Sequence, residues 1–197
     1  MSKLFFRYGA MNSGKSTALL QVAHNYEERG QAVVVFKPDT DTKGGRTVVS
    51  RLGVARDVDI LLSTDQDLRG AVAEYRARRG IEGLCDVACV LIDEAQFLTP
   101  AQVDQALATA VLDDLPVLAF GIRTDFRTRA FPGSQRLLEV AHSFAEMKTI
   151  CRCGRKAIFN ARLGENGVQT EGDQVLIDGS GTTYEALCGR CYLEGPA

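Results

Sequence analysis

Eight consecutive residues near the start of the chain have the types and spacing that bind phosphate. They match the pattern G-x-x-x-x-G-K-S, in which glycines allow a tight loop whose backbone N–H groups turn inward on phosphate oxygens. The lysine would reach the β- and γ-phosphates, and the serine hydroxyl would hold Mg²⁺. The alternative, an accidental glycine turn, is disfavoured because the pattern lies between a predicted strand and a predicted helix. The residues of this loop are Gly9, Ala10, Met11, Asn12, Ser13, Gly14, Lys15 and Ser16.

An acidic pair, Asp93 and Glu94, follows a second apolar segment. Ligands of open parallel sheets lie at the carboxyl ends of the strands, so Asp93 should lie close to Ser16 and hold the metal through water. Glu94 could accept a proton from an attacking nucleophile, which is water in an ATPase and a substrate hydroxyl in a kinase. The dipeptide alone does not distinguish the two, and a solvated strand end is the structural alternative. The sequence lacks N-K-x-D, which disfavours a GTPase.

Two pairs of cysteines near the end of the chain have spacings that suit a metal. Cys151 and Cys153 form the first pair, and Cys188 and Cys191 form the second. Four thiolates on two turns are typical of tetrahedral zinc, although the 34 intervening residues exceed the usual ~15–20 of a zinc ribbon. The excess should form a loop that stands out from the metal. The alternative is that the four thiols bind no metal. The remaining two cysteines, Cys85 and Cys89, are interpreted as packing residues.

Composition limits what kind of protein carries these groups. With 197 residues, 45% of them hydrophobic and 24% charged, the chain is typical of one globular domain with a small appendage. Its 23 basic and 25 acidic residues argue against a protein that mainly coats nucleic acid. No apolar run approaches the ~20 residues that span a bilayer, and the first residues do not read as a secretion signal, so we expect a cytoplasmic protein. In the cytoplasm, six cysteines are thiols or metal ligands rather than disulfides.

Strands and helices alternate along most of the chain. This order predicts an α/β fold: a P-loop, RecA-like parallel sheet with helices on both faces. At Cys151 the pattern changes, which predicts a P-loop ATP-binding domain over 1–150 and a small zinc-ribbon domain over 151–197. The segment 37–51 is interpreted as a loop whose first half is mobile. Strands are predicted over 3–8, 32–36, 87–92 and 116–120, and helices over 16–29, 68–79, 137–144 and after a capping box at 99–102.

Several longer motifs together resemble one family. They are GAMNSGKST at the phosphate loop, SRLG at 50–53, LIDEAQFL at the acidic pair, GIRTDFR at 121–127 and KTICRCGRKA at 148–157, followed by EGDQV and a late tyrosine. On these motifs the chain closely resembles the bacterial cytosolic thymidine kinases, the tetrameric class with a zinc-bearing lasso domain. The resemblance covers nearly the whole length.

The resemblance implies transfer of the ATP γ-phosphate to the 5′-hydroxyl of thymidine or deoxyuridine. Glu94 would be the general base, and Asp93 would hold Mg²⁺ with Ser16. Gln96 and Arg46 would belong to the ATP side, and Arg162 would touch phosphate. The four cysteines would hold a structural Zn²⁺.

The resemblance also implies a nucleoside pocket. Phe97 and Phe126 would flank the thymine ring, although either could simply fill the core. The main chain of the lasso, around Val175–Gly179, would meet the base edge, and Tyr184 would approach the sugar or the ring. The 5-methyl pocket would be lined by Met11, Ile122 and Asn160, and the lasso residues concerned are Val175, Ile177 and Gly179.

For partners, the resemblance implies thymidine, ATP, feedback by dTTP and a homotetramer, with no nucleic acid and no membrane. Two other functions stay open from the residues alone. A strand-exchange or motor ATPase could bind nucleic acid through its zinc ribbon, and the acidic charge balance argues against this. A non-catalytic nucleotide-binding regulator would not need Glu94.

Overall fold

The computed structural model of the chain describes residues 1–40, 45–164, 167–172, 174 and 183–195. A six-stranded sheet in the order β5-β2-β6-β7-β1-β8 forms its centre, and all neighbouring strands run parallel, as predicted. The carboxyl ends of the strands therefore meet at one edge. The strands are β1 (Leu4–Tyr8), β2 (Ala32–Pro38), β5 (Ile60–Leu62), β6 (Val87–Ile92), β7 (Val117–Gly121) and β8 (Ser143–Glu146).

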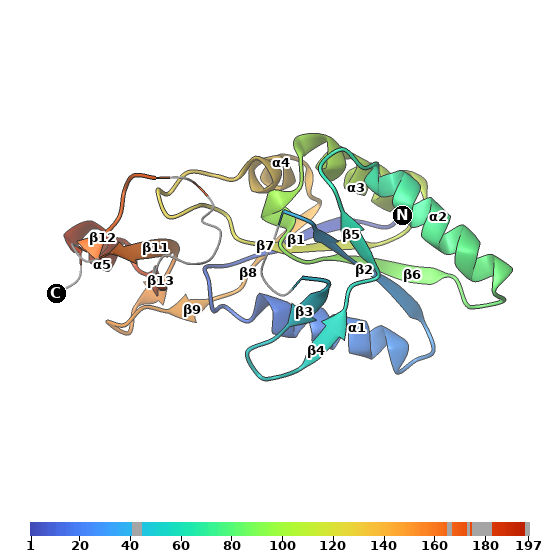
Figure 1. Cartoon of the computed structure of the whole chain (residues 1–197), viewed down its shortest axis with the longest axis horizontal. Helices are drawn as coiled ribbons and strands as arrows, with labels where there is room; N and C mark the ends of the chain where they lie inside the picture. Colours follow the sequence, from blue (N-terminus) through green and yellow to red (C-terminus); the bar gives the residue numbers. More distant parts are fainter. Residues whose placement is uncertain (41–44, 165–166, 173, 175–182, 196–197) are drawn as a thin grey trace.

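Helices cover both faces of this sheet (Figure 1). Along β2, Val34 and Phe36 pack into one core and Val33 and Val35 pack into another, and all four are buried. This alternation explains why residues 32–36 of the strand are all apolar. The first core is closed by α2 (Leu68–Ile81), α3 (Pro100–Leu112) and α4 (Pro132–Val140), and the second by α1 (Lys15–Glu27).

The predicted capping box at the start of α3 is present. The Gln102 N–H donates to Thr99 Oγ1 at 3.2 Å, and the Thr99 N–H donates to Gln102 Oε1 at 3.1 Å. Pro100 occupies the first helical turn, where its missing N–H costs nothing. The cap fixes the direction in which α3 leaves η1 (Ala95–Phe97), the short 3₁₀ turn that follows the acidic pair.

The prediction of a helix over 137–144 is wrong for residues 141–144. The helix starts at Pro132 and ends at Val140, and Ala141 takes an extended conformation with ψ 141°. The chain then becomes β8, the strand at the edge of the sheet beside β1. His142 fixes this change, because its N–H donates to Leu4 O at 2.9 Å and its Nδ1 accepts from the Leu4 N–H at 3.1 Å.

The segment predicted as a loop over 37–51 is partly regular. Lys37 and Pro38 belong to β2, and β3 (Thr47–Val49) pairs antiparallel with β4 (Ala55–Asp57). The prediction was therefore wrong at Lys37, Pro38 and 47–49, and residues 41–44 of the expected mobile half lie outside the described residues. Within the described residues, we find no helix with the length and apolarity needed to cross a membrane.

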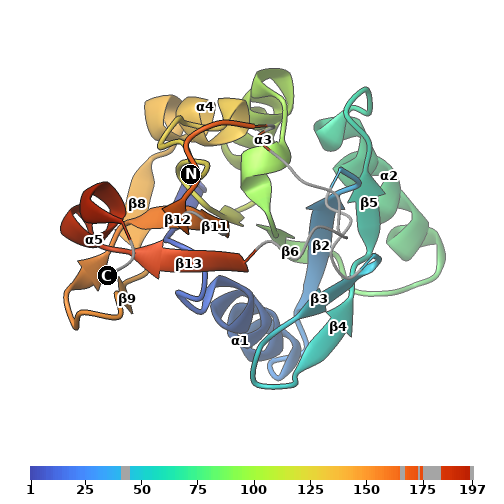
Figure 2. The ribbon, with the colours of Figure 1, turned by 60° about the vertical axis from the view of Figure 1, so that its left-hand side comes forward.

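The chain after residue 148 forms a lobe of small antiparallel sheets at one end of the molecule (Figures 1 and 2). Its core includes Ala10 of the phosphate loop together with Ala161 and Leu187, so the lobe packs directly against that loop. The elements are β9 (Thr149–Ile150) paired with β10 (Lys156–Ala157), β11 (Phe159–Gly164) between β12 (Gly167–Val168) and β13 (Thr183–Leu187), and α5 (Gly189–Glu194).

Candidate active site

The phosphate-binding pattern forms the turn between β1 and α1. Asn12 and Gly14 both have positive φ, 66° and 81°, and Gly14 precedes α1 without a side-chain cap. The first N–H groups of α1 are therefore left for a ligand, in the way helix N-termini bind anions. The Lys15 ammonium donates to the carbonyls of Gly9 at 3.3 Å and Ala10 at 3.0 Å. Burial lowers the pKa of Lys15, and the charges of Glu94 and Asp93 oppose that shift.

The acidic pair lies at the carboxyl end of β6. The Asp93 N–H donates to Phe36 O at 2.9 Å, which places Asp93 beside the end of β2, and Asp93 is buried. Glu94 has a φ of 48°, in the left-handed region that costs energy for a residue with a side chain. Gln96 holds the Glu94 carboxylate, donating to Oε2 at 2.5 Å, while Gln96 Oε1 accepts from the Ile122 N–H at 3.1 Å. The buried Gln96 thus ties Glu94 to the end of β7.

One cavity of about 1120 Å³ joins these groups to an apolar wall. Lys15, Ser16, Asp93 and Glu94 line one part of it. A second part combines aromatic, aliphatic and amide side chains, so the cavity can hold a charged group and a flat, mostly apolar group together. This second part contains Met11, Phe97, Ile122, Phe126, Phe131, Asn160 and Tyr184.

Asn160 connects the lobe to both walls of the cavity. Its Oδ1 accepts from the Met11 N–H at 2.7 Å, and its Nδ2 donates to Thr124 O at 3.1 Å. The residue is buried near the start of β11, the middle strand of its three-stranded sheet. Because both ends of the amide bind backbone groups, Asn160 fixes the phosphate loop against the loop after β7.

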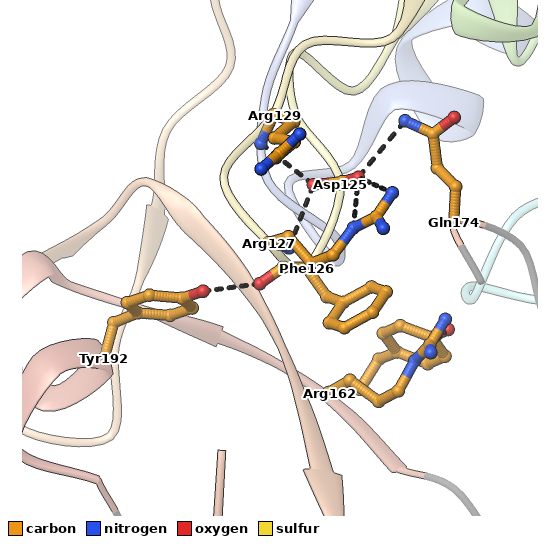
Figure 3. A network of polar contacts seen from close by, with 8 residues as sticks. Asp125, Phe126, Arg127, Arg129, Arg162, Gln174 and Tyr192 are labelled. Carbon is orange, nitrogen blue, oxygen red and sulfur yellow. Dashed lines mark hydrogen bonds and ion pairs between the residues drawn. The ribbon is translucent and has the colours of Figure 1, made fainter. Parts of the chain in front are cut away.

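Phe126 is held from two sides (Figure 3). The Arg162 guanidinium lies over its ring, 3.6 Å from the centroid, and the Tyr192 hydroxyl donates to its carbonyl at 2.6 Å. Arg162 is 1% exposed, and its Nε donates to the Tyr184 hydroxyl at 2.9 Å. A guanidinium packed on an aromatic face gains both stacking and electrostatic attraction. Phe126 is thereby fixed as part of the cavity wall.

The four cysteines predicted to bind metal lie together. All four Sγ atoms are within 4.8 Å of one another, and those of Cys153 and Cys188 are 3.6 Å apart. Tetrahedral zinc with Zn–S bonds of ~2.3 Å separates its sulfurs by roughly 3.8 Å, so the cluster fits the ion. Burial would raise the pKa of Cys151, but N–H groups of Cys153 and Cys188 bind its sulfur and lower the pKa to about 6. At Cys151 this favours the thiolate form that ligates metals, whereas the hydrogen bonds with Cys153 and Cys151 raise the pKa of Cys191 to about 12.

The sequence matches one family over almost all of its length. The family model described as "Thymidine kinase" matches residues 2–192. This chain belongs to the thymidine kinase family. A thymidine kinase of Legionella pneumophila strain Philadelphia 1 is 46% identical over 199 residues, covering 100% of this chain and 92% of the relative. The thymidine kinase of Idiomarina loihiensis is 44% identical, over 98% of this chain and 97% of the relative. The thymidine kinase of Enterobacteria phage T4 is 41% identical, over 98% of this chain and 97% of the relative. Family membership makes the chain a kinase.

Most of the predicted site residues line the cavity, but not all of them. Gln96 lies at the cavity, but its side chain binds Glu94 and the Ile122 N–H as described above. Arg46 is exposed and is absent from the cavity lining. Arg162 was expected to touch phosphate, and its guanidinium instead stacks on Phe126. Val175, Ile177 and Gly179 lie outside the described residues.

Sequence reasoning missed other residues of the cavity. Lys37 is 2% exposed, donates to Gly45 O at 3.4 Å and lines the cavity, as does Arg51. The signal for Lys37 was its place directly after the buried strand AVVVF, at the same edge as Asp93. Phe131 packs edge-on against Phe97, with centroids 5.6 Å apart, and no spacing in the sequence indicates this contact.

Proposed function

We propose that the chain transfers the γ-phosphate of ATP to the 5′-hydroxyl of thymidine, and also of deoxyuridine. The observation that carries the proposal is the single cavity that joins the phosphate loop and the acidic pair to an apolar wall. A kinase must bring a nucleotide phosphate and an acceptor hydroxyl into line, and most of its catalysis is positioning and charge stabilisation. Two separate sites could not do this.

In this proposal Glu94 is the general base that accepts the proton of the 5′-hydroxyl. The hydrogen bond from Gln96 and the left-handed backbone at Glu94 support a fixed carboxylate at the end of β6. Lys15 and the loop N–H groups bind the β- and γ-phosphates. Ser16 and Asp93 would hold Mg²⁺, which when bound neutralises charge on the phosphates. Arg46 and Gln96 complete the proposed ATP side.

The thymine ring is proposed to lie between Phe97 and Phe126. The stacking of Arg162 on Phe126 and the edge contact of Phe131 with Phe97 support two fixed aromatic walls. Met11, Ile122 and Asn160 would surround the 5-methyl group, and Tyr184 would meet the sugar or the ring. The main chain of 175–179, with Val175, Ile177 and Gly179, is proposed to read the base edge.

The remaining assignments are proposals as well. We propose a kinase domain over 1–150 and a lasso domain over 151–197 that binds one structural Zn²⁺ through its four cysteines. We also propose a cytoplasmic homotetramer inhibited by dTTP, with no nucleic acid or membrane partner.

An assay with three nucleosides tests the substrate. If backbone groups read the edge of the base, thymidine and deoxyuridine present the same edge and cytosine presents the opposite donor and acceptor pattern. A site built on hydrogen bonds rejects such an analogue by about 10⁴-fold in kcat/KM. We therefore expect thymidine slightly above deoxyuridine, with deoxycytidine nearly inert. Efficient phosphorylation of deoxycytidine, or ADP release stimulated by DNA rather than by nucleoside, would contradict the proposal.

A further inference from the structure

Asp125 lies in the loop between β7 and α4 and lines the cavity, yet the proposed chemistry gives it no role. Its side chain is fully buried in an ion pair with the Arg127 guanidinium. A buried carboxylate is costly unless every lone pair finds a donor, so its partners indicate what it holds in place.

The two oxygens of Asp125 serve different parts of the chain (Figure 3). Oδ1 accepts from the backbone N–H groups of Arg127 and Arg129, both at 2.9 Å, and so fixes the turn that carries Phe126. Oδ2 accepts from Arg127 Nε and Nη2 at 3.2 Å and from Gln174 Nε2 at 3.2 Å. Among the residues that the structure describes, Gln174 is a hydrogen-bond partner from outside this loop, and it also lines the cavity.

Phe126 depends on this arrangement. The Arg127 guanidinium that Asp125 holds lies 5.6 Å from the centre of the Phe126 ring, and the Arg162 guanidinium lies at 3.6 Å. The Asp125 carboxylate thus brings a negative charge to a ring flanked by two cations. It also joins the Phe126 turn to Gln174, which lies between β12 and β13 in the sequence and lines the cavity.

We propose that Asp125 is a positioning residue of the nucleoside site: it locks the Phe126 turn and holds Gln174 of the lobe against it. The proposal rests on the assignment of Phe126 to the thymine site. Because Asp125 touches neither Lys15 nor Glu94 among the described contacts, loss of the lock should raise the KM for thymidine and leave the KM for ATP and kcat nearly unchanged.

The donor and the acceptor of the hydrogen bond between Gln174 and Asp125 can be exchanged by substituting both side chains. In Asp125→Asn the amide oxygen must stay toward the backbone N–H groups, so the amide nitrogen faces the donors of Arg127 and Gln174. In Gln174→Glu a second carboxylate faces that of Asp125. Gln174→Glu loses one hydrogen bond to a charged group and should raise the thymidine KM by about 10- to 100-fold. Asp125→Asn loses the same bond together with two from Arg127 and should raise the thymidine KM by at least as much.

The double variant Asp125→Asn with Gln174→Glu restores the pairing with its polarity reversed. The Asn amide would donate to the Glu carboxylate, which can also accept from Arg127. We expect its thymidine KM to return to within about threefold of the unmodified protein, a coupling that independent sites do not show.

Two substitutions outside the cavity serve as controls. Asp104→Asn removes the carboxylate of another Asp–Arg pair, with Arg136 Nε at 2.7 Å, and Gln31→Glu adds the same charge at an exposed turn. Neither should change the KM for thymidine or ATP. The four proteins of the Asp125–Gln174 cycle, each full length and loaded with zinc, are compared by steady-state kinetics and by unfolding in urea.

The outcomes separate the two proposals. If the unmodified protein does not phosphorylate thymidine, the proposed function fails, while the urea cycle still shows whether Asp125 and Gln174 are coupled. If thymidine is phosphorylated but the two single effects on KM simply multiply in the double variant, the positioning role of Asp125 is overturned. Equal increases in the KM for ATP and the KM for thymidine would overturn it as well, because they would indicate a general loss of structure.

Discussion

Gly133, in the first turn of α4, offers a sharp test of how the site is held. A Cβ added there would lie 2.5 Å from Leu98 O, 2.8 Å from Ala95 O and 2.9 Å from Gln96 O. All three are backbone oxygens of η1 and its end, so no side-chain rotation relieves the contact. Ordinary contact begins at 3.4 Å, so Gly133→Ala must separate α4 and η1 by about 0.9 Å, the difference between 3.4 and 2.5 Å.

That displacement reaches the proposed general base and the proposed base-binding wall, because η1 carries Phe97 and the Gln96 that holds Glu94. A misplacement of about 1 Å in a catalytic group can cost 10²-fold in rate. We therefore expect Gly133→Ala to lower kcat/KM for thymidine by about 10²-fold. Overpacking of this kind should also lower the free energy of unfolding by about 1–3 kcal/mol.

Gly80→Ala is the matched control, because Gly80 also lies in a helix, α2, and a Cβ there meets nothing within 4 Å. It should stabilise the protein by about 0.5–1 kcal/mol and leave kcat/KM unchanged. The assays are steady-state phosphorylation of thymidine and unfolding in urea. A Gly133→Ala variant as stable as Gly80→Ala, with kcat/KM within threefold of the unmodified protein, would refute the reasoning.

Three further expectations concern single groups. Glu94→Gln keeps the hydrogen-bonding shape but loses basicity, so kcat should fall by about 10²–10⁴-fold with ATP binding little changed; a kcat within threefold would exclude Glu94 as the base. Elemental analysis should find one zinc per chain and none in Cys188→Ser, whose thymidine KM should rise; freshly purified protein without zinc would contradict this. Burial raises the pKa of Cys89 to about 12, so at neutral pH this thiol stays protonated, and of the two cysteines outside the four-cysteine cluster mass spectrometry should find alkylation at the exposed Cys85 and not at Cys89; equal labelling of these two would be incompatible with the fold.

The sequence predicted best those features whose cause is local. The strand over 87–92, the capping box at Thr99 and the turn between β1 and α1 each depend on residues within a few positions. The cluster of cysteines was also predictable, because four thiolates that bind one metal ion must lie close together whatever the fold around them. The parallel sheet followed from the alternation of apolar strands and helices.

The errors occur where distant contacts decide. Apolar residues through 137–144 favour a helix, but His142 bonds to Leu4 and makes the segment the edge strand β8. Pro132 marks the true start of that helix, because proline is favoured in the first helical turn. The short strands β3 and β5 have three residues each, too few for a period to be visible.

The part of the cavity proposed to hold the nucleoside could be suggested only through the family resemblance, because its walls come from segments far apart in the sequence. Asn160 and Met11 are 149 positions apart, yet one hydrogen bond joins the start of β11 to the backbone of the phosphate loop. Ala10, the neighbouring residue, is buried in the core of the same lobe. The loop proposed to bind phosphate therefore has the lobe as one of its structural supports. It follows that a change in the lobe, at the cysteines or at β11, acts on both halves of the cavity, because Met11 belongs to the phosphate loop and lines the wall proposed for the base.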